Sequence, residues 1–181
     1  RAQLNGIVEL PSGGTVFDYA LAGADWGFVE WMSLSKPFVY SPDMPYLQLV
    51  VPTIDTVRYG YLLQLMLTAG RSTLLVGGTG VGKSIIAADC LRQLQRENDV
   101  FPIDIGFSAR TSAGRTQEIF ETKLDRRRNT LCGPNGRQVV AFVDDINMPA
   151  PDTYGAQPPI ELLRQFLDFG GFYDRTKLNW K

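Results

Sequence analysis

The sequence predicts an α/β fold in which helices cover both faces of a parallel sheet. Three observations support this prediction. Short apolar segments alternate with segments of helical periodicity, a glycine-rich segment joins one such strand to one such helix, and another apolar strand ends in two adjacent carboxylates. Strands that alternate with helices form parallel sheets, because each helix carries the chain back to the edge at which the next strand begins.

The composition indicates one globular domain with a lead-in segment. The chain has 181 residues, of which 44% are hydrophobic and 20% are charged, and this is typical of a folded domain with a real core. Residues 1–48 lack clean periodicity but are rich in aromatic residues, which disordered segments lack. We expect residues 1–48 to pack on a neighbouring module and residues 49–181 to form the regular domain. The chain begins at Arg1 and stops just after a strand-like segment at 176–180, so we expect it to be a piece of a longer protein.

Charge and cysteine content argue against several kinds of partner. The formal net charge of −1 gives no electrostatic reason to expect nucleic acid or an acidic membrane. No apolar run approaches the roughly 18 residues that span a bilayer. Cys90 and Cys132, in a chain without histidine, predict neither a disulfide framework nor a metal cluster. We expect two reduced thiols.

The regular elements are predicted from apolar patterns and from the residues that start and stop helices. We expect strands at 47–51, 74–76, 103–107 and 138–143. We expect helices from Thr53 to Gly70, from about 83 to 95, from about 112 to the arginine run at 126–128, and from Pro158 to Gly170. A tight turn at 133–136 leads into the last strand.

The glycine-rich segment matches the phosphate-loop pattern G-x-x-x-x-G-K-[ST] between a predicted strand and a predicted helix. Glycines permit backbone angles that a side chain forbids, so successive N–H groups can turn toward phosphate oxygens, and the helix adds its positive end. Lys83 is expected to reach the β- and γ-phosphates, and the Ser84 hydroxyl to bind Mg²⁺. The expected nucleotide-binding residues are Gly77, Gly78, Thr79, Gly80, Val81, Gly82, Lys83, Ser84 and Ile85.

An apolar strand that ends at Asp144 and Asp145 fits a Walker B element, which delivers a carboxylate beside the loop that holds the metal. Asp144 is expected to hold Mg²⁺ through water, because magnesium keeps several waters. Asp145 is the candidate catalytic acid that orients the attacking water. ATPases of the AAA+ class usually carry Glu there, and Asp retracts the carboxylate by about 1.5 Å. Because a misplacement of about 1 Å can lower a rate by about 100-fold, we expect ATP or ADP to bind and hydrolysis to be slow or absent.

Other charged and polar residues leave alternatives open. Residues 122–125 (TKLD) resemble a guanine-reading motif, but they lie upstream of the Walker B strand, whereas GTPases place that motif downstream. Arg110 and Arg115 face either a phosphate or a neighbouring module, and Asn147 either positions water or braces its loop. Residues 126–128 are expected to form a solvated helix end that suits the helix dipole, with a dedicated acidic partner as the alternative.

Four segments together resemble the third AAA+ module of a dynein heavy chain. They are residues 51–59 (VPTIDTVRY), 107–113 (FSARTSA), 143–150 (VDDINMPA) and 154–168 (YGAQPPIELLRQFLD). The Asp-Asp pair followed by Asn-Met-Pro is more similar to axonemal than to cytoplasmic dyneins. The resemblance implies a ring of six AAA+ modules in one chain that drives movement along microtubules. It also implies that the third module is a regulatory nucleotide site, with residues 51–53 against the adenine.

The same resemblance implies an architecture, partners and a location. The architecture is a three-layer α/β/α P-loop NTPase with strand order 5-1-4-3-2, truncated here before the fourth and fifth core strands. The partners are neighbouring AAA+ modules of the same heavy chain, other dynein chains, and microtubules through a stalk outside this segment, without nucleic acid or membrane. The location is the cytoplasm and cytoskeleton, in the axoneme of a cilium or flagellum. The alternatives are a binding-only structural module and an unrelated AAA+ machine of the midasin or chaperone type.

Overall fold

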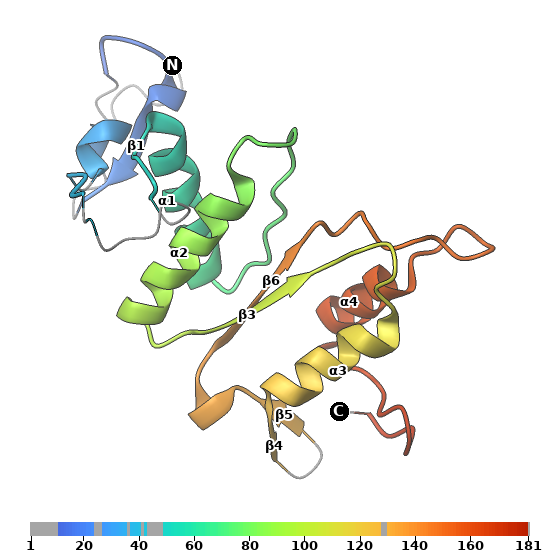
Figure 1. The fold of residues 1–181 in the computed structure, drawn as a ribbon. Helices are drawn as coiled ribbons and strands as arrows, with labels where there is room; N and C mark the ends of the chain where they lie inside the picture. The colour runs from blue at the N-terminus through green and yellow to red at the C-terminus, as the bar shows by residue number, and fades with distance from the viewer. Residues whose placement is uncertain are drawn as a thin grey trace, which may run out of the picture. The chain divides into compact units, whose positions relative to one another are not determined.

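The structure is a computed structural model that describes residues 11–23, 27–35, 37–40, 42, 49–127 and 130–180. The chain divides into two compact units, Arg1–Cys90 and Leu91–Lys181. Helix α2 (Lys83–Glu97) runs across this division (Figure 1).

The first unit opens with an antiparallel hairpin that packs on a helix of the same chain. Strands β1 (Tyr19–Ala22) and β2 (Gly27–Glu30) pair, and a 3-10 turn, η2 (Trp31–Leu34), follows. The buried Trp31 indole donates a hydrogen bond of 2.9 Å to the Phe17 carbonyl, and its ring lies edge-on to Tyr61 with the centroids 5.8 Å apart. Packing of this lead-in on a neighbouring module stays a prediction.

Helix α1 (Ile54–Thr68) begins and ends where its capping residues predict. The Thr53 hydroxyl accepts a hydrogen bond of 3.2 Å from the Thr56 N–H, and the Thr56 hydroxyl accepts one of 2.7 Å from the Thr53 N–H. This reciprocal capping box satisfies donors that a helix start leaves unpaired. Gly70, at φ +67°, follows the last turn. The strand predicted at 47–51 is not found in the described residues 49–51, and residues 47–48 lie outside the described ranges.

The strand predicted at 74–76, directly before the glycine loop, is wrong. Residues 71–78 are irregular, and Leu74 and Val76 are 68% and 85% exposed. A strand exists only through hydrogen bonds to a neighbouring strand, and none of the described strands pairs with this segment. The helix predicted at 83–95 is confirmed as α2.

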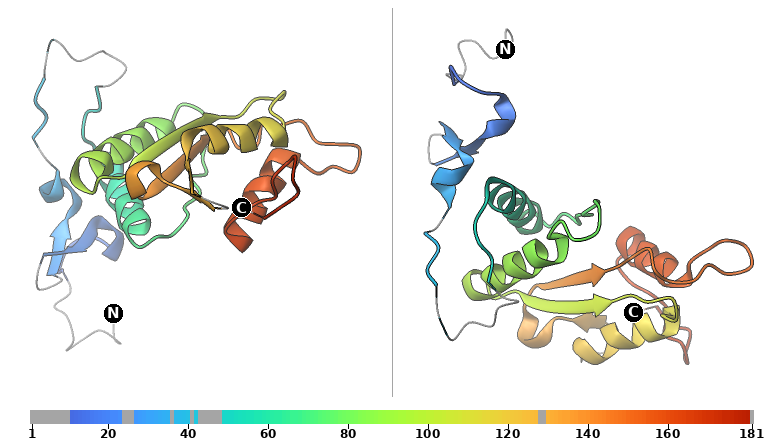
Figure 2. Two further views of the ribbon diagram at one scale, coloured as in Figure 1. Left: turned by 90° about the horizontal axis from the view of Figure 1, so that it is seen from below. Right: turned by 45° about the horizontal axis from the view of Figure 1, so that its top comes forward.

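The second unit contains a parallel strand pair with two helices on one of its faces. Strands β3 (Phe101–Gly106) and β6 (Val139–Asp144) run side by side (Figure 2). They pair from Phe101 with Val139 to Gly106 with Asp144. Ile103, Ile105 and Phe107 alternate toward the core and are 0%, 3% and 5% exposed. This confirms the predicted α/β class, with both strands within two residues of their predicted bounds.

Helices α3 (Ala113–Lys123) and α4 (Pro158–Phe169) close this core through aromatic contacts. The ring of Phe120 stacks on that of Phe166 at 5.9 Å and lies 6.5 Å from that of Phe172. Burying each such side chain contributes roughly 1.5–3 kcal/mol. Gly170, in the left-handed conformation at φ +69°, ends α4 as predicted.

The helix predicted to reach residues 126–128 is wrong in its last turn. Helix α3 ends at Lys123, and Leu124 turns extended at ψ 145°. Strand β4 (Asp125–Arg127) then pairs with β5 (Thr130–Cys132) in a hairpin. Arg126 and Arg127 therefore lie on a strand rather than at a helix end, and Arg128 lies outside the described residues.

The two remaining predictions on local structure have different outcomes. The turn at 133–136 is confirmed as a 3-10 turn, η4 (Pro134–Gly136), before β6. The strand-like segment at 176–180 is instead a turn, in which Trp180 makes an isolated bridge to Tyr173. No helix within the described ranges has the length and apolar character needed to cross a membrane.

Candidate nucleotide-binding site

Two glycines of the phosphate loop have backbone conformations that side chains disfavour. Gly80 and Gly82 lie at φ +77° and +87°, in the left-handed region. Residues with a Cβ rarely adopt this region. The loop therefore needs glycine at these two positions to turn its backbone into α2.

The loop and the first turn of α2 present unpaired backbone donors. The N–H of Ile86 donates 2.9 Å to the Gly82 carbonyl. For the N–H groups of residues 80–85, no acceptor is found in the described part of the chain. A row of free N–H groups at the positive end of a helix is the arrangement that binds phosphate. The chemistry of this donor set fits a polyphosphate.

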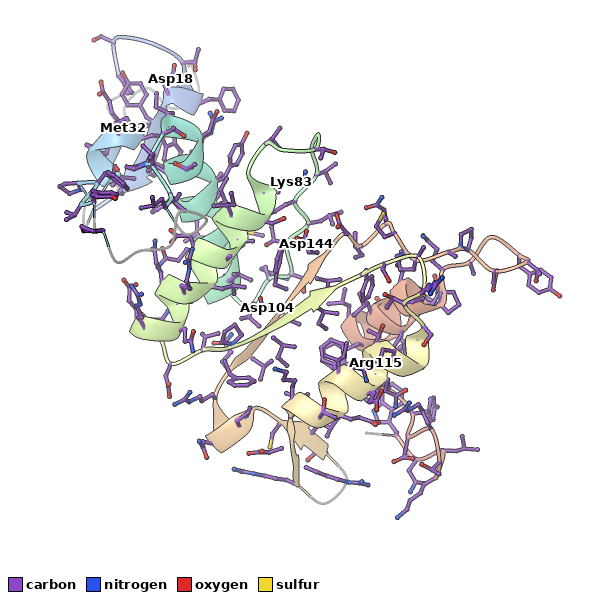
Figure 3. The ribbon with its side chains drawn as sticks, in the orientation of Figure 1. Asp18, Met32, Lys83, Asp104, Arg115 and Asp144 are labelled. Carbon is purple, nitrogen blue, oxygen red and sulfur yellow. The ribbon has the colours of Figure 1, made fainter. Side chains whose placement is uncertain are left out.

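Lys83 folds back over the loop from the first position of α2 (Figure 3). Its ammonium donates hydrogen bonds of 3.0 Å to the Gly77 carbonyl and 2.5 Å to the Gly78 carbonyl. Lys83 is the only charged side chain among residues 77–85, so its charge adds to the helix dipole and favours an anion. Ser84 follows it and is half-buried.

The acidic pair lies where β6 ends (Figure 3). The Phe107 N–H donates 3.0 Å to the Asp144 carbonyl and so extends the parallel ladder to this residue. The half-buried Asp144 carboxylate accepts a hydrogen bond of 3.1 Å from the Asp145 N–H. Asp145 is exposed and has a left-handed backbone, at φ +54°. The chain therefore turns sharply at the candidate catalytic acid.

The loop after β3 lies against the segment that follows the acidic pair. The hydroxyl of Thr111 accepts a hydrogen bond of 2.9 Å from the Ser108 N–H, and the Ala109 carbonyl accepts one of 3.3 Å from the Ala150 N–H. Both segments follow the carboxyl ends of parallel strands, the edge at which ligands bind in open α/β sheets. The sequence patterns did not predict this link.

Gln157 is a site-supporting residue that the sequence interpretation missed. Its side-chain amide donates 3.1 Å to the Asn147 carbonyl and 2.6 Å to the Pro149 carbonyl. The contact at Asn147 is to its backbone carbonyl, so both predicted roles of the Asn147 side chain stay open. The sequence predicted the helix start at Pro158, directly after this glutamine, but nothing in the spacing of Gln157 indicated the carbonyls that it binds.

The remaining candidates are exposed or lie at element boundaries, and their predicted alternatives stay open. Arg115 forms an exposed ion pair of 2.7 Å with Glu118 on the same helix, and Arg110 is exposed. Residues 122–125 straddle the end of α3 and the start of β4.

Cys90 and Cys132 are free thiols, as predicted. Burial, followed by the nearby charge of Asp89, raises the pKa of the Cys90 thiol to about 11.

The predicted site residues fall into two sets. Residues 77–85 belong to the first unit, and Asp144 and Asp145 belong to the second. Within the described ranges, no three carboxylate or thiol side chains gather around one point where they could hold a metal. The joint magnesium role of Ser84 and Asp144 stays a prediction.

A glycine loop opening a helix, together with a parallel strand that ends in two acids, defines a P-loop nucleotide-binding protein. Residues 38–181 match the family model described as "P-loop containing dynein motor region". The chain belongs to this family.

Individual relatives are axonemal dynein heavy chains. The chain is 47% identical over 178 residues to dynein axonemal heavy chain 6 of Homo sapiens, a match that covers 98% of this chain and 4% of the relative. It is 44% identical over 182 residues to dynein axonemal heavy chain 1 of Homo sapiens, a match that covers 91% of this chain and 4% of the relative. It is 43% identical over 164 residues to dynein axonemal heavy chain 12 of Mus musculus, a match that covers 89% of this chain and 5% of the relative. The chain thus spans 4–5% of the length of these relatives. The predicted dynein heavy-chain family is confirmed, and the assignment to the third module stays a prediction.

Proposed function

We propose that this chain is the nucleotide-binding part of the third AAA+ module of an axonemal dynein heavy chain, and that it binds ATP or ADP with Mg²⁺. The observation that carries the proposal is the row of unpaired N–H groups at residues 80–85, which opens α2 beside the Lys83 ammonium.

Each residue of the loop has a role in this proposal. The free N–H groups bind phosphate oxygens, and Lys83 leaves the carbonyls of Gly77 and Gly78 to bind the β- and γ-phosphates. Ser84 and Asp144 hold the metal, Asp144 through water. When bound, Mg²⁺ supplies positive charge to the phosphates.

The site is proposed to regulate a motor rather than to drive it. Asp145 is one methylene shorter than the usual Glu, and its backbone is confined by the turn at φ +54°. Both features make the placement of a water for attack on the γ-phosphate harder. A binding-only module is the second candidate, and the same observation at Asp145 favours it.

The names of the relatives support a place in a larger machine. We infer that the whole protein is a microtubule-based motor of cilia or flagella, located in the axoneme. Its partners would be the neighbouring AAA+ modules of the same chain, other dynein chains, and microtubules through a stalk outside residues 1–181.

The test is photoaffinity labelling of the intact heavy chain with 8-azido-ATP, followed by mapping of the labelled peptides to residues 1–181. Other modules of the chain do not interfere, because the peptides identify the site. Wild-type protein should be labelled in this segment, and Lys83→Ala should lose that label. The matched control Lys177→Ala, which removes an exposed lysine outside the loop, should keep it. Equal labelling of wild type and Lys83→Ala would refute the proposal.

A further inference from the structure

The loop between β6 and α4, residues 150–157, presents an aromatic side chain to solvent. Tyr154 is 93% exposed, more than any other large hydrophobic residue in the described ranges. The loop extends away from β3, β6 and α4 in every view of Figures 1 and 2. A tyrosine ring so placed makes almost no contact with its own unit.

The 150–157 loop is nevertheless held in one shape by its own hydrogen bonds. The Asp152 carboxylate accepts hydrogen bonds of 2.8 Å from the Tyr154 N–H and 2.9 Å from the Ala156 N–H. The Asp152 N–H donates 2.7 Å to the Ala156 carbonyl, and Gly155, at φ +82°, completes the turn. The loop therefore displays Tyr154 instead of letting it collapse onto the surface.

The base of the loop is also held by hydrogen bonds and by buried prolines. The Ala150 N–H donates to the Ala109 carbonyl, and the Gln157 amide donates to the Pro149 carbonyl. Pro149 and Pro159, on either side, are fully buried. Because both ends are anchored, docking of the tip would require little further ordering, and preorganisation of this kind raises affinity.

The chemistry of the loop indicates the surface that it fits. Asp152 is the only charged residue from 149 to 160, and its carboxylate is already engaged by two backbone N–H groups. The loop thus offers a rigid aromatic ring with one hydroxyl. Tyrosine suits such contacts because it brings a large apolar area and one polar group with few rotatable bonds.

We propose that the 150–157 loop is a docking element that inserts Tyr154 into an apolar pocket, rimmed by a hydrogen-bonding group, on another part of the same heavy chain. This inference rests on the proposed function. The partner is assigned to the same polypeptide because the relatives are heavy chains of which this sequence covers 4%, and a tethered surface is present at high effective concentration. Since the loop follows the acidic pair and is joined to Asn147 through Gln157, docking would also hold the segment beside Asp145.

The experiment places the photo-cross-linking residue p-benzoylphenylalanine at position 154 of the intact heavy chain. After irradiation, the cross-linked peptides are mapped by mass spectrometry. We expect cross-links from position 154 to heavy-chain residues outside 1–181. In the same protein, Asp152→Ala removes the carboxylate that shapes the loop but keeps the probe, and it should abolish the cross-link.

Three outcomes would overturn the inference: cross-links confined to residues 1–181, cross-links only to a separate polypeptide, or a yield that Asp152→Ala leaves unchanged. Labelling by 8-azido-ATP is measured on the same protein. If residues 1–181 are labelled by the nucleotide but the expected cross-link is absent, only the docking proposal is rejected. If residues 1–181 of the wild-type protein are not labelled, the proposed function is rejected.

Discussion

The side-chain amide of Gln157 donates a hydrogen bond of 2.6 Å to the backbone carbonyl of Pro149. The same amide reaches the Asn147 carbonyl at 3.1 Å. One side chain thus closes the segment that runs from the acidic pair to the start of α4. It connects the segment after the acidic pair to the 150–157 loop.

We predict that Gln157→Ala loosens this segment without unfolding the unit. Two carbonyls lose their donor, and an unmade hydrogen bond to a partly buried group costs about 1–3 kcal/mol. Amide hydrogen exchange of residues 148–156 should accelerate by about 10-fold, which corresponds to about 1.4 kcal/mol. The matched control is Gln165→Ala, a half-buried glutamine on α4 that should leave this exchange unchanged. Equal exchange in both variants would show that Gln157 does not hold the loop.

A second prediction concerns the segment after α4, which is fastened to α3. The buried amide of Gln117 donates 2.8 Å to the Tyr173 carbonyl. Gln117→Ala should loosen this segment, although Arg175 still contacts the Gly114 carbonyl and Glu121, so that trypsin cleaves faster after Lys177 in the native protein. Glu118→Ala on the same helix loses only an exposed ion pair with Arg115, worth about 0.3–0.5 kcal/mol, and should not change the cleavage rate. Unaltered cleavage in Gln117→Ala would contradict the assigned role.

Helix bounds were predictable from the sequence because their signals are local. Thr53 caps α1 through its neighbour Thr56, and Gly170 ends α4 through its own left-handed backbone. The segment at 74–76 has an equally clear apolar pattern, but a strand also needs a hydrogen-bonded neighbour. The arginine run was misassigned because it does have such a neighbour: Asp125 pairs with Cys132 in the β4–β5 hairpin, and α3 ends before it.

The candidate site divides in the same way. The turn from the glycine loop into α2 was predictable, because the glycines at fixed spacing mark it in the sequence themselves. Gln157 was not, because its partners are backbone carbonyls that any residue supplies. The left-handed turn at Asp145 also escaped prediction, since Asp adopts this conformation without a sequence pattern that marks it.

Gly133 is predicted to be indispensable for close packing rather than for its backbone angle. Its φ is −61°, which any residue adopts. An added Cβ would overlap the Arg137 carbonyl and lie 2.7 Å from the Val139 Cγ2. Overpacking of this kind destabilises by about 1–3 kcal/mol. Pulse proteolysis across a urea series gives the urea concentration at the midpoint of cleavage within residues 91–181. This midpoint should therefore be lower in Gly133→Ala than in the wild type. In Gly106→Ala, where an added Cβ meets nothing within 4 Å, the midpoint should stay unchanged; equal midpoints for the two variants would count against close packing at Gly133.

Cys90 is predicted to resist alkylation in the native protein. Burial, then the charge of Asp89, raises its pKa from 9.0 to about 11. At pH 8 this leaves about 100-fold less of the reactive thiolate. Iodoacetamide should label native Cys90 far more slowly than unfolded Cys90, as measured by mass spectrometry. Because the raised pKa favours the protonated native state, its stabilising contribution is complete below pH 9 and is lost as the pH rises to about 11. Cys90→Ala should remove this part of the alkaline destabilisation, and rapid native labelling at pH 8 would contradict the prediction.

Asp145 provides the prediction that separates a slow ATPase from a binding-only module. Its left-handed backbone at φ +54° suits a short polar side chain, and Asn shares this tolerance, so Asp145→Asn should fold and bind nucleotide normally. The protein is labelled with 8-azido-[α-³²P]ATP, and the label on residues 1–181 is divided into triphosphate and its hydrolysis product, diphosphate. If the carboxylate orients water, the diphosphate fraction should fall in Asp145→Asn. Asp145→Glu restores the missing methylene, and since about 1 Å of placement changes rates by about 100-fold, the diphosphate fraction should rise while total label stays constant. An unchanged fraction in Asp145→Asn would remove Asp145 from the chemistry and leave the binding-only module, because a residue that positions the attacking water cannot lose its charge without effect.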